Sequence, residues 1–270
     1  MTSLDPMSTN RLFVIIRIPK SGSNTLRRII GAALPEAAIH SMPNPSKPDG
    51  GVSFVEKLRV ARGRIRRRWR NYNVLTNDQA WSRIAGTASN GDIVQGHIGY
   101  GDPQLPGFEL DYITIVRDPV QRLMSEYFYS RRGFEKRGFI RKFYNRGRLR
   151  AAASLDFSDY VAFIHERQDL YANRATRFIT GAHTCEDPAA FLMENYFHFG
   201  TLEQIDVYVS TLSEKLSSTV PMAHYNLSEN REEIPLTAKD KSRLEDLYSE
   251  DMKLHRAATA LVKSGKTGRP

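Results

Sequence analysis

The sequence predicts an α/β protein, a single domain with a central parallel sheet of about five strands that helices flank. Short apolar runs typical of buried strands alternate along the chain with stretches whose apolar residues follow helical spacing. One of these runs leads directly into Arg117, Asp118 and Pro119, a sequence that ends a strand and starts a helix. Strands that alternate with helices imply a parallel sheet covered on both faces, with ligands at the carboxyl ends of the strands.

The first strand is predicted at residues 12–18, an apolar and largely β-branched run that only Arg17 interrupts. Pro19 ends this strand, a small polar loop follows, and a helix is expected at 25–33. An arginine within an apolar strand is costly to bury unpaired. We therefore expect Arg17 to have an anionic partner.

The remaining elements follow from the same two periodicities. Further strands are expected at 92–98, 111–116, 196–199 and 220–225. Helices are expected from Asp118 onward with Val120, Leu123, Met124, Tyr127 and Phe128 on the buried face, at 157–166, at 173–179, behind a capping-box pattern of Thr201 and Gln204, and along a final stripe of Leu244, Leu247, Tyr248 and Met252. Residues 40–51 are expected to form a loop.

The ends and the composition complete the outline. Residues 1–10 are expected to form a flexible arm, 11–262 the domain and 263–270 a flexible tail. The single cysteine, Cys185, excludes a disulfide framework and a cysteine metal site. The chain shows no signal-peptide pattern and no run long enough to span a membrane, so a cytoplasmic protein is expected.

The formal charge of +9 suggests a polyanionic partner or an anionic ligand. Basic residues gather at 59–70, where no acid lies among them, and at 131–150, where three glycines suggest a mobile segment. Both stretches are candidates to bind an acidic acceptor, and Arg66, Arg67, Arg131 and Arg132 are the side chains expected to do so. Solvated basic faces, or contact with a membrane surface, remain the alternatives.

The loop after the first strand has the composition of an anion cradle. Lys20 adds a point charge, Ser21, Ser23 and Thr25 add hydroxyl donors beside Asn24, and Gly22 lets the backbone close around an oxyanion. The start of a helix adds free backbone N–H groups and the positive end of its dipole. This loop is not a Walker motif, because its lysine precedes the glycine and no Gly-Lys-Ser/Thr follows. An ordinary strand–loop–helix with an exposed Lys20 is the alternative.

Two motifs resemble those of sulfotransferases that use 3′-phosphoadenosine 5′-phosphosulfate (PAPS). PKSGSNTL is similar to the 5′-phosphosulfate loop, closest to the type found in heparan sulfate 2-O-sulfotransferases and their bacterial relatives. VRDPVQRLMSEYFYSRR is similar to the 3′-phosphate motif, which implies that Arg117 and Ser125 bind that phosphate. The resemblance implies a P-loop-like PAPS-binding fold. Pairing of Arg117 with a carboxylate, with Ser125 merely on a helix surface, is the alternative.

A histidine is the expected general base, and His97 is the best placed because it ends a strand before a glycine-rich turn. VQGHIGYG also resembles the family segment that carries the catalytic histidine. Family members often have a second histidine two residues earlier, where this chain has Gln95. The resemblance also implies that Lys20 stabilises the leaving bridge oxygen and that Arg17 lies near the sulfuryl group. A strand-end histidine satisfied in the core is the alternative for His97.

Three further segments resemble the family more weakly. NRATRFITG, which holds Arg174 and Arg177, is similar to a segment of bacterial members, and both arginines are candidate substrate ligands. NYFHFGTLEQID is similar to a strand-and-helix region. AHYNLSENREEIPLT is similar to a loop that covers the nucleotide, which implies contacts from Ser228 and Arg231.

The resulting hypothesis is an O-sulfotransferase that moves a sulfuryl group from PAPS to a carbohydrate hydroxyl by in-line displacement, without a metal. Polysaccharide, oligosaccharide and glycolipid acceptors all fit. Golgi relatives carry a membrane anchor that this sequence does not show, which implies either a bacterial-type cytoplasmic enzyme or a shortened chain. A basic nucleic-acid-binding protein and a P-loop-like phosphoryl transferase are the alternatives, although no recognised nucleic-acid motif, Mg²⁺ site or Walker lysine is visible.

Overall fold

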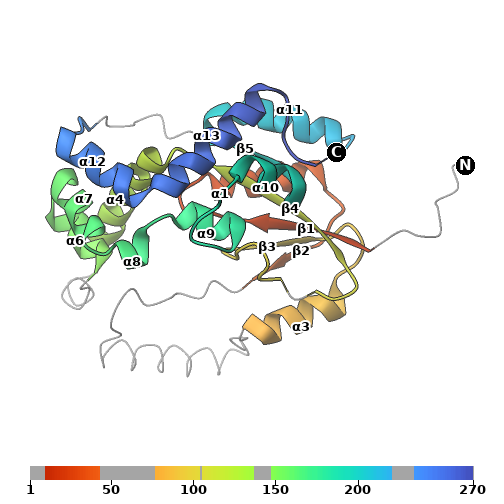
Figure 1. The fold of residues 1–270 in the computed structure, drawn as a ribbon. Helices are drawn as coiled ribbons and strands as arrows, with labels where there is room; N and C mark the ends of the chain where they lie inside the picture. The colour runs from red at the N-terminus through yellow and green to blue at the C-terminus, as the bar shows by residue number, and fades with distance from the viewer. Residues whose placement is uncertain (1–9, 43–76, 104, 137–146, 221–233, 270) are drawn as a thin grey trace, which may run out of the picture.

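The computed structural model describes residues 10–42, 77–103, 105–136, 147–220 and 234–269. It confirms an α/β fold with five parallel strands in the order β2-β3-β1-β4-β5, flanked by helices (Figure 1). The strands are β1 (Arg11–Ile16), β2 (Ile39–Ser41), β3 (Ile93–Gly96), β4 (Glu109–Val116) and β5 (Tyr196–Thr201).

One strand differs from the prediction. β2 lies where the chain was expected to enter a loop, and it pairs with β3 at the edge of the sheet. Three residues are too few for a period to be visible in the sequence. The strand predicted at 220–225 lies outside the described residues except for Val220, which belongs to no strand.

Helices cover both faces of the sheet (Figure 1). Side chains of β1 alternate between two apolar clusters, as the pleat requires. One cluster joins the sheet to α1 (Ser23–Ala33) and α11 (Ile205–Lys215). The other joins it to α3 (Asn77–Thr87), α9 (Arg174–Thr180), α10 (Pro188–Asn195) and α13 (Ser249–Lys263).

A third apolar cluster is formed by helices alone, beside the sheet (Figure 1). Its buried side chains come from α4 (Pro119–Glu135), α6 (Arg148–Ser154), α7 (Phe157–His165), α8 (Gln168–Tyr171) and α12 (Ala238–Leu247). The stripe expected to form one final helix is divided between α12 and α13, because Tyr248 leaves the helical conformation between them.

The basic stretch 131–150 was expected to be mobile, but both of its ends are helical. Arg131 and Arg132 continue α4, and Arg148 begins α6, whereas residues 137–146 lie outside the described part. Helix α4 starts as predicted, with the Asp118 side chain accepting a hydrogen bond from the Gln121 backbone at 2.8 Å.

The buried face of α4 is more polar than predicted. Leu123 and Tyr127 are buried as expected, but Arg122, Glu126 and Ser130 are buried beside them. Val120, Met124 and Phe128 are only half-buried. Spacing alone cannot assign an arginine or a glutamate to the interior, because burying its charge is costly unless a buried partner pairs with it.

Two other local predictions are wrong. Thr201 and Gln204 form no capping box, because the Thr201 hydroxyl donates to the Gln204 side chain at 3.0 Å within a 3₁₀ turn, Leu202–Gln204, and α11 begins afterwards. Residues 264–269, expected as a flexible tail, instead pack along β5. The backbone carbonyl of Thr267 accepts from Phe199 at 2.7 Å, and Arg269 forms an ion pair with buried Asp111.

The arm predicted at 1–10 lies outside the described residues except for its last residue. None of the helices in the described segments has the length and apolarity needed to cross a membrane.

Candidate functional site

The candidate site lies at the carboxyl ends of β1 and β4, which are neighbours in the sheet. From β1 the chain connects to β2, toward one edge of the sheet, whereas from β4 it connects to β5, toward the opposite edge. Ligands of open α/β sheets bind where neighbouring connections diverge in this way. The loop after β1 and the residue after β4, Arg117, therefore border the position that the topology favours.

The loop after β1 turns sharply before α1. Lys20 has a φ of 68° and Gly22 a φ of 75°, both in the left-handed region. At Gly22 a Cβ atom would also lie 2.7 Å from Cδ1 of Leu202 in the turn after β5, so a larger residue would displace that side chain. Gly22 is the N-cap residue of α1, and no side chain in the described part of the chain caps this helix. The first backbone N–H groups of α1 are thus available to an anion.

Arg117 joins the two motifs that the sequence analysis singled out. Its side chain is largely buried, and Nη1 donates to the backbone carbonyl oxygen of Lys20 at 3.0 Å. This hydrogen bond fixes the lysine loop against the end of β4. The ammonium of Lys20 lies 3.6 Å from the centre of the Tyr129 ring on α4, a cation–π contact that orients the side chain.

Strand β1 ends at Ile16, earlier than predicted, so Arg17 lies directly after the strand and not within it. Its Nη2 donates to the amide oxygen of Asn24 at 3.3 Å, and its Nε is buried without a hydrogen-bond partner among the described residues. The anionic partner expected for Arg17 is not found in the described part of the chain. An amide gives the guanidinium an acceptor but no opposite charge.

His97 follows β3 and lies beside Arg17. Its Nδ1 is 2.5 Å from the backbone carbonyl oxygen of Arg17. Because a carbonyl oxygen only accepts, Nδ1 carries the proton, and Nε2 of the neutral ring keeps its lone pair. This is the tautomer that a base acting through Nε2 requires.

The pKa of His97 is lowered from its ordinary value. Burial is the main cause, and the positive charges of Arg17 and Arg174 add to it, while the hydrogen bond to the Arg17 carbonyl acts in the opposite direction. His97 is therefore mostly neutral at pH 7 and able to accept a proton.

The cations of the site also have lowered pKa values. Burial lowers the pKa of Arg17, and the charge of Arg27 lowers it further. Burial lowers the pKa of Lys20 as well; the Glu126 carboxylate opposes the shift, but two neighbouring arginines restore it. Burial likewise lowers the pKa of Arg174. Charges that depress one another in this way favour the binding of an anion.

The other residues predicted for the cradle differ in exposure. Ser21 is buried, and its hydroxyl has no hydrogen-bond partner in the described part of the chain. Ser23 and Thr25 are half-buried and Asn24 is exposed, all in the first turn of α1. Ser125 is half-buried in the second turn of α4.

The predicted acceptor residues are not brought together. Arg131 and Arg132 are exposed near the end of α4, and Arg177 is exposed on α9. Among the described acceptor candidates, Arg174 alone lies close enough to His97 for its charge to act on that ring, as the charge of Arg17 also does. The predictions for Arg66, Arg67, Ser228 and Arg231 lie outside the described residues.

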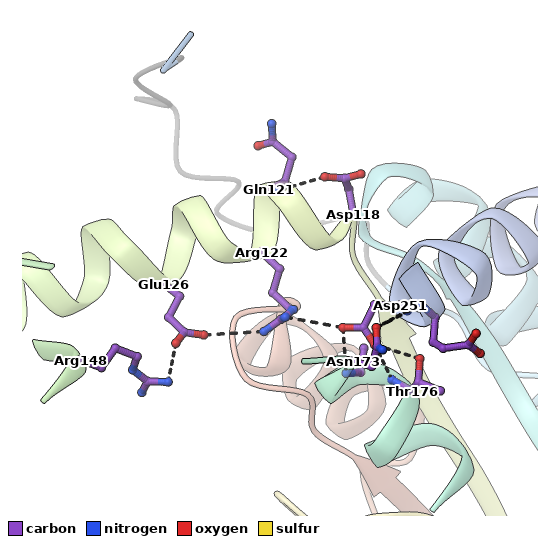
Figure 2. A network of polar contacts seen from close by, with 10 residues as sticks. Asp118, Gln121, Arg122, Glu126, Arg148, Asn173, Thr176 and Asp251 are labelled. Carbon is purple, nitrogen blue, oxygen red and sulfur yellow. Dashed lines mark hydrogen bonds and ion pairs between the residues drawn. The ribbon is translucent and has the colours of Figure 1, made fainter. Parts of the chain in front are cut away.

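A buried ionic network joins the helices next to the candidate site (Figure 2). Arg122 on α4 is 1% exposed, with Nη1 3.7 Å from a Glu126 oxygen and Nη2 3.6 Å from an Asp251 oxygen. The second Glu126 oxygen contacts Arg148 on α6. The network thus holds α4, α6 and α13 together through paired charges.

Asp251 also caps α9 (Figure 2). Its carboxylate accepts from the backbone of Ala175 at 3.2 Å and from the backbone and hydroxyl of Thr176 at 2.8 and 2.9 Å. In return the Asn173 side chain accepts from the backbones of Glu250 and Asp251 at 3.1 and 3.2 Å. These reciprocal caps fix α9, and with it Arg174, against α13.

Sequence reasoning missed this network and the contact between Lys20 and Tyr129. Arg122 and Glu126 stand four residues apart, which is the one local signal of a pair. The partner on α13 is far along the chain, so the sequence offers no spacing that reveals it.

No model of a known protein family matches the chain, and no curated protein matches it in sequence. The function is therefore inferred from the site itself.

Proposed function

We propose that the protein is an O-sulfotransferase that transfers the sulfuryl group of PAPS to a hydroxyl of a carbohydrate, using a P-loop-like fold. The observation that carries the proposal is the hydrogen bond at 3.0 Å between Arg117 and the Lys20 carbonyl. It joins an arginine able to bind one phosphate to an uncapped helix start able to bind another, as a nucleotide with 3′ and 5′ anionic groups requires.

In this proposal each residue of the site has its own role. The first turn of α1 and Lys20 hold the 5′-phosphosulfate, while Arg117 and Ser125 hold the 3′-phosphate. The buried hydroxyl of Ser21 and the incompletely paired Arg17 are further groups that an anion in the loop would stabilise.

His97 acts as the general base. Nε2 takes the proton of the acceptor hydroxyl as its oxygen attacks sulfur, and the bond from sulfur to the bridging phosphate oxygen breaks. Lys20 stabilises the negative charge that this oxygen gains, and 3′-phosphoadenosine 5′-phosphate (PAP) leaves with it. Arg17 polarises the sulfuryl oxygens.

The test is an acceptor screen with PAPS labelled in its sulfuryl group. We expect transfer of label to at least one carbohydrate, with one PAP released for each label transferred. Release of label only to water, or no turnover together with no affinity for PAP, would overturn the proposal. Salt-dependent binding of arbitrary DNA that Lys20→Ala does not change would instead favour a nucleic-acid-binding protein.

A further inference from the structure

A groove of about 460 Å³ lies among α6, α7 and α8, away from the lysine loop. Its polar lining is dominated by Arg148, Arg150 and Arg167, and its apolar lining includes Leu155, Phe163, Leu170 and Tyr171. None of the described residues that line it is an aspartate or a glutamate. The groove therefore combines an apolar lining with three arginines, of which Arg148 also pairs with Glu126 and Arg167 with Glu166.

The aromatic rings and the arginines are arranged together. The guanidinium of Arg167 lies 3.9 Å from the centre of the Phe163 ring, and its Nη1 donates to the Phe163 carbonyl at 2.9 Å. The guanidinium of Arg148 lies 5.8 Å from the centre of the Tyr171 ring. These contacts hold the two guanidinium groups in place, so they lose little freedom when a ligand binds. Arg150 lines the same groove and is exposed.

Arg148 connects the groove with the candidate site. Its guanidinium contacts Glu126, which lies on α4 one residue after Ser125 (Figure 2). In Figure 1 the helices that form the groove lie on the side of the sheet where α4 and α9 lie. A long acceptor that reaches His97 could thus extend along α4 into the groove.

We propose that this groove binds an acidic sugar unit of the acceptor. The volume lies in the range of small-ligand sites, roughly 300–1,000 Å³. A sugar ring packs its C–H face on apolar side chains such as Leu155 and Leu170, and a carboxylate or sulfate ester on the ring accepts paired hydrogen bonds from arginine. The identity of the ligand as part of an acceptor rests on the proposed function, whereas the binding of an acidic sugar does not.

The test is binding of fluorescent hexasaccharides at physiological salt. The probes are a hyaluronan fragment with carboxylates, a chondroitin sulfate fragment with carboxylates and sulfates, and neutral maltohexaose. We expect the protein to bind at least one acidic probe and not the neutral one. The ratio between the two acidic probes tells which anionic group the groove prefers, and failure of both to bind overturns the proposal.

Two variants locate the binding. Arg150→Gln with Arg167→Gln should weaken binding of the acidic probe by at least about tenfold, since charged hydrogen bonds are lost. The matched control, Arg83→Gln with Arg256→Gln, removes the same charge from exposed positions on α3 and α13 and should change affinity less than about twofold. Equal losses in both would overturn the proposal, because they would show a general charge effect.

A third variant tests the shape of the groove. Ser154→Trp keeps every arginine but fills part of the space, since Ser154 is an exposed lining residue at the end of α6. We expect it to weaken the acidic probe to a similar degree, with an unchanged melting temperature. Wild-type affinity in this variant would contradict binding in the groove.

Affinity for PAP separates the two proposals. All of these variants should bind PAP like the wild type. If the wild type fails to bind PAP but binds the acidic probe through Arg150 and Arg167, the proposed function falls and the sugar site stands. If PAP binds and the acidic probes do not, only the sugar site falls.

Discussion

Helices α1 and α9 start with similar backbone conformations, but their first backbone N–H groups differ in hydrogen bonding. Their N-cap residues, Gly22 and Asn173, both have left-handed backbones, with φ of 75° and 46°. The start of α9 is closed by the buried carboxylate of Asp251, which accepts from two backbone N–H groups. The start of α1 receives no side-chain cap from any residue that the structure describes. One helix start is satisfied from within the protein, and the other is suited to an anion from outside it.

The arginines beside these two helix starts show the same contrast. Burial alone lowers the pKa of Arg122, but Tyr248, Asp251 and Glu126 raise it overall. Burial lowers the pKa of Arg17, and its neighbour Arg27 lowers it further. The region around Asp251 is therefore balanced in charge and stabilises the fold. No carboxylate among the described residues offsets the charge of Arg17 in this way, which favours an anion from outside the protein.

The largest expected effect is on catalysis at the candidate site beside the start of α1. His97→Ala removes the proposed base but neither phosphate contact, so kcat should fall by ~10²–10⁴. Affinity for PAP, measured by calorimetry, should stay near that of the wild type. Near-wild-type turnover would place the base elsewhere. The exposed His183 would then be tested next, ahead of Glu126, because two arginines already pair with Glu126.

The pH dependence sharpens this prediction. The lowered pKa of His97 means that the neutral ring persists below the ordinary histidine value of about 6.5. The rate should therefore rise with pH along a limb that lies below that value and be level at pH 7. The limb should be absent from the residual activity of His97→Ala. A limb centred above the ordinary value would contradict the geometry around this ring.

The next largest effect is on stability, at the α9 region. Asp251→Ala leaves Arg122 with an incompletely compensated buried charge and removes the cap of α9, so it should cost about 3–5 kcal/mol of unfolding free energy. Asp246→Ala is the matched control, because its carboxylate is 65% exposed and pairs with His165 at the surface. The control should cost less than about 1 kcal/mol. Denaturant unfolding that gives equal losses would refute the assigned roles.

A buried histidine outside both regions provides a further measure of stability. His198 in β5 is fully buried, donates through Nε2 to the Tyr208 carbonyl at 3.1 Å, and burial lowers its pKa to about 3. The unfolded chain binds a proton near pH 6.5 that the folded chain excludes, so stability falls as pH drops below that value. Between pH 6.5 and 4 the loss should be roughly 3 kcal/mol.

His198→Gln keeps an N–H donor and cannot titrate, so denaturant unfolding of this variant should depend less on pH over that range. A pH profile identical to that of the wild type would show that His198 does not carry the effect.

The sequence was sufficient where chemistry and position coincide within one short stretch. The lysine loop and Arg117 follow directly after apolar strands, so a parallel sheet was enough to predict that they face the same edge. It was insufficient where a residue depends on a distant partner. The burial of Arg122 rests on Asp251, 129 residues later in the numbering, and the packing of residues 264–269 rests on β5 and Asp111. Neither partner is marked by spacing.

The most direct measurement of the central claim is calorimetry with PAP. The wild type should bind PAP, because no described residue provides for α1 the internal anion that Asp251 provides for α9. Lys20→Ala and Arg117→Ala should each weaken binding by roughly 1.5–3 kcal/mol, the value of a charged hydrogen bond, while Arg83→Ala on the exposed side of α3 should not change it. A wild type without affinity for PAP, or site variants that bind like Arg83→Ala, would contradict the account.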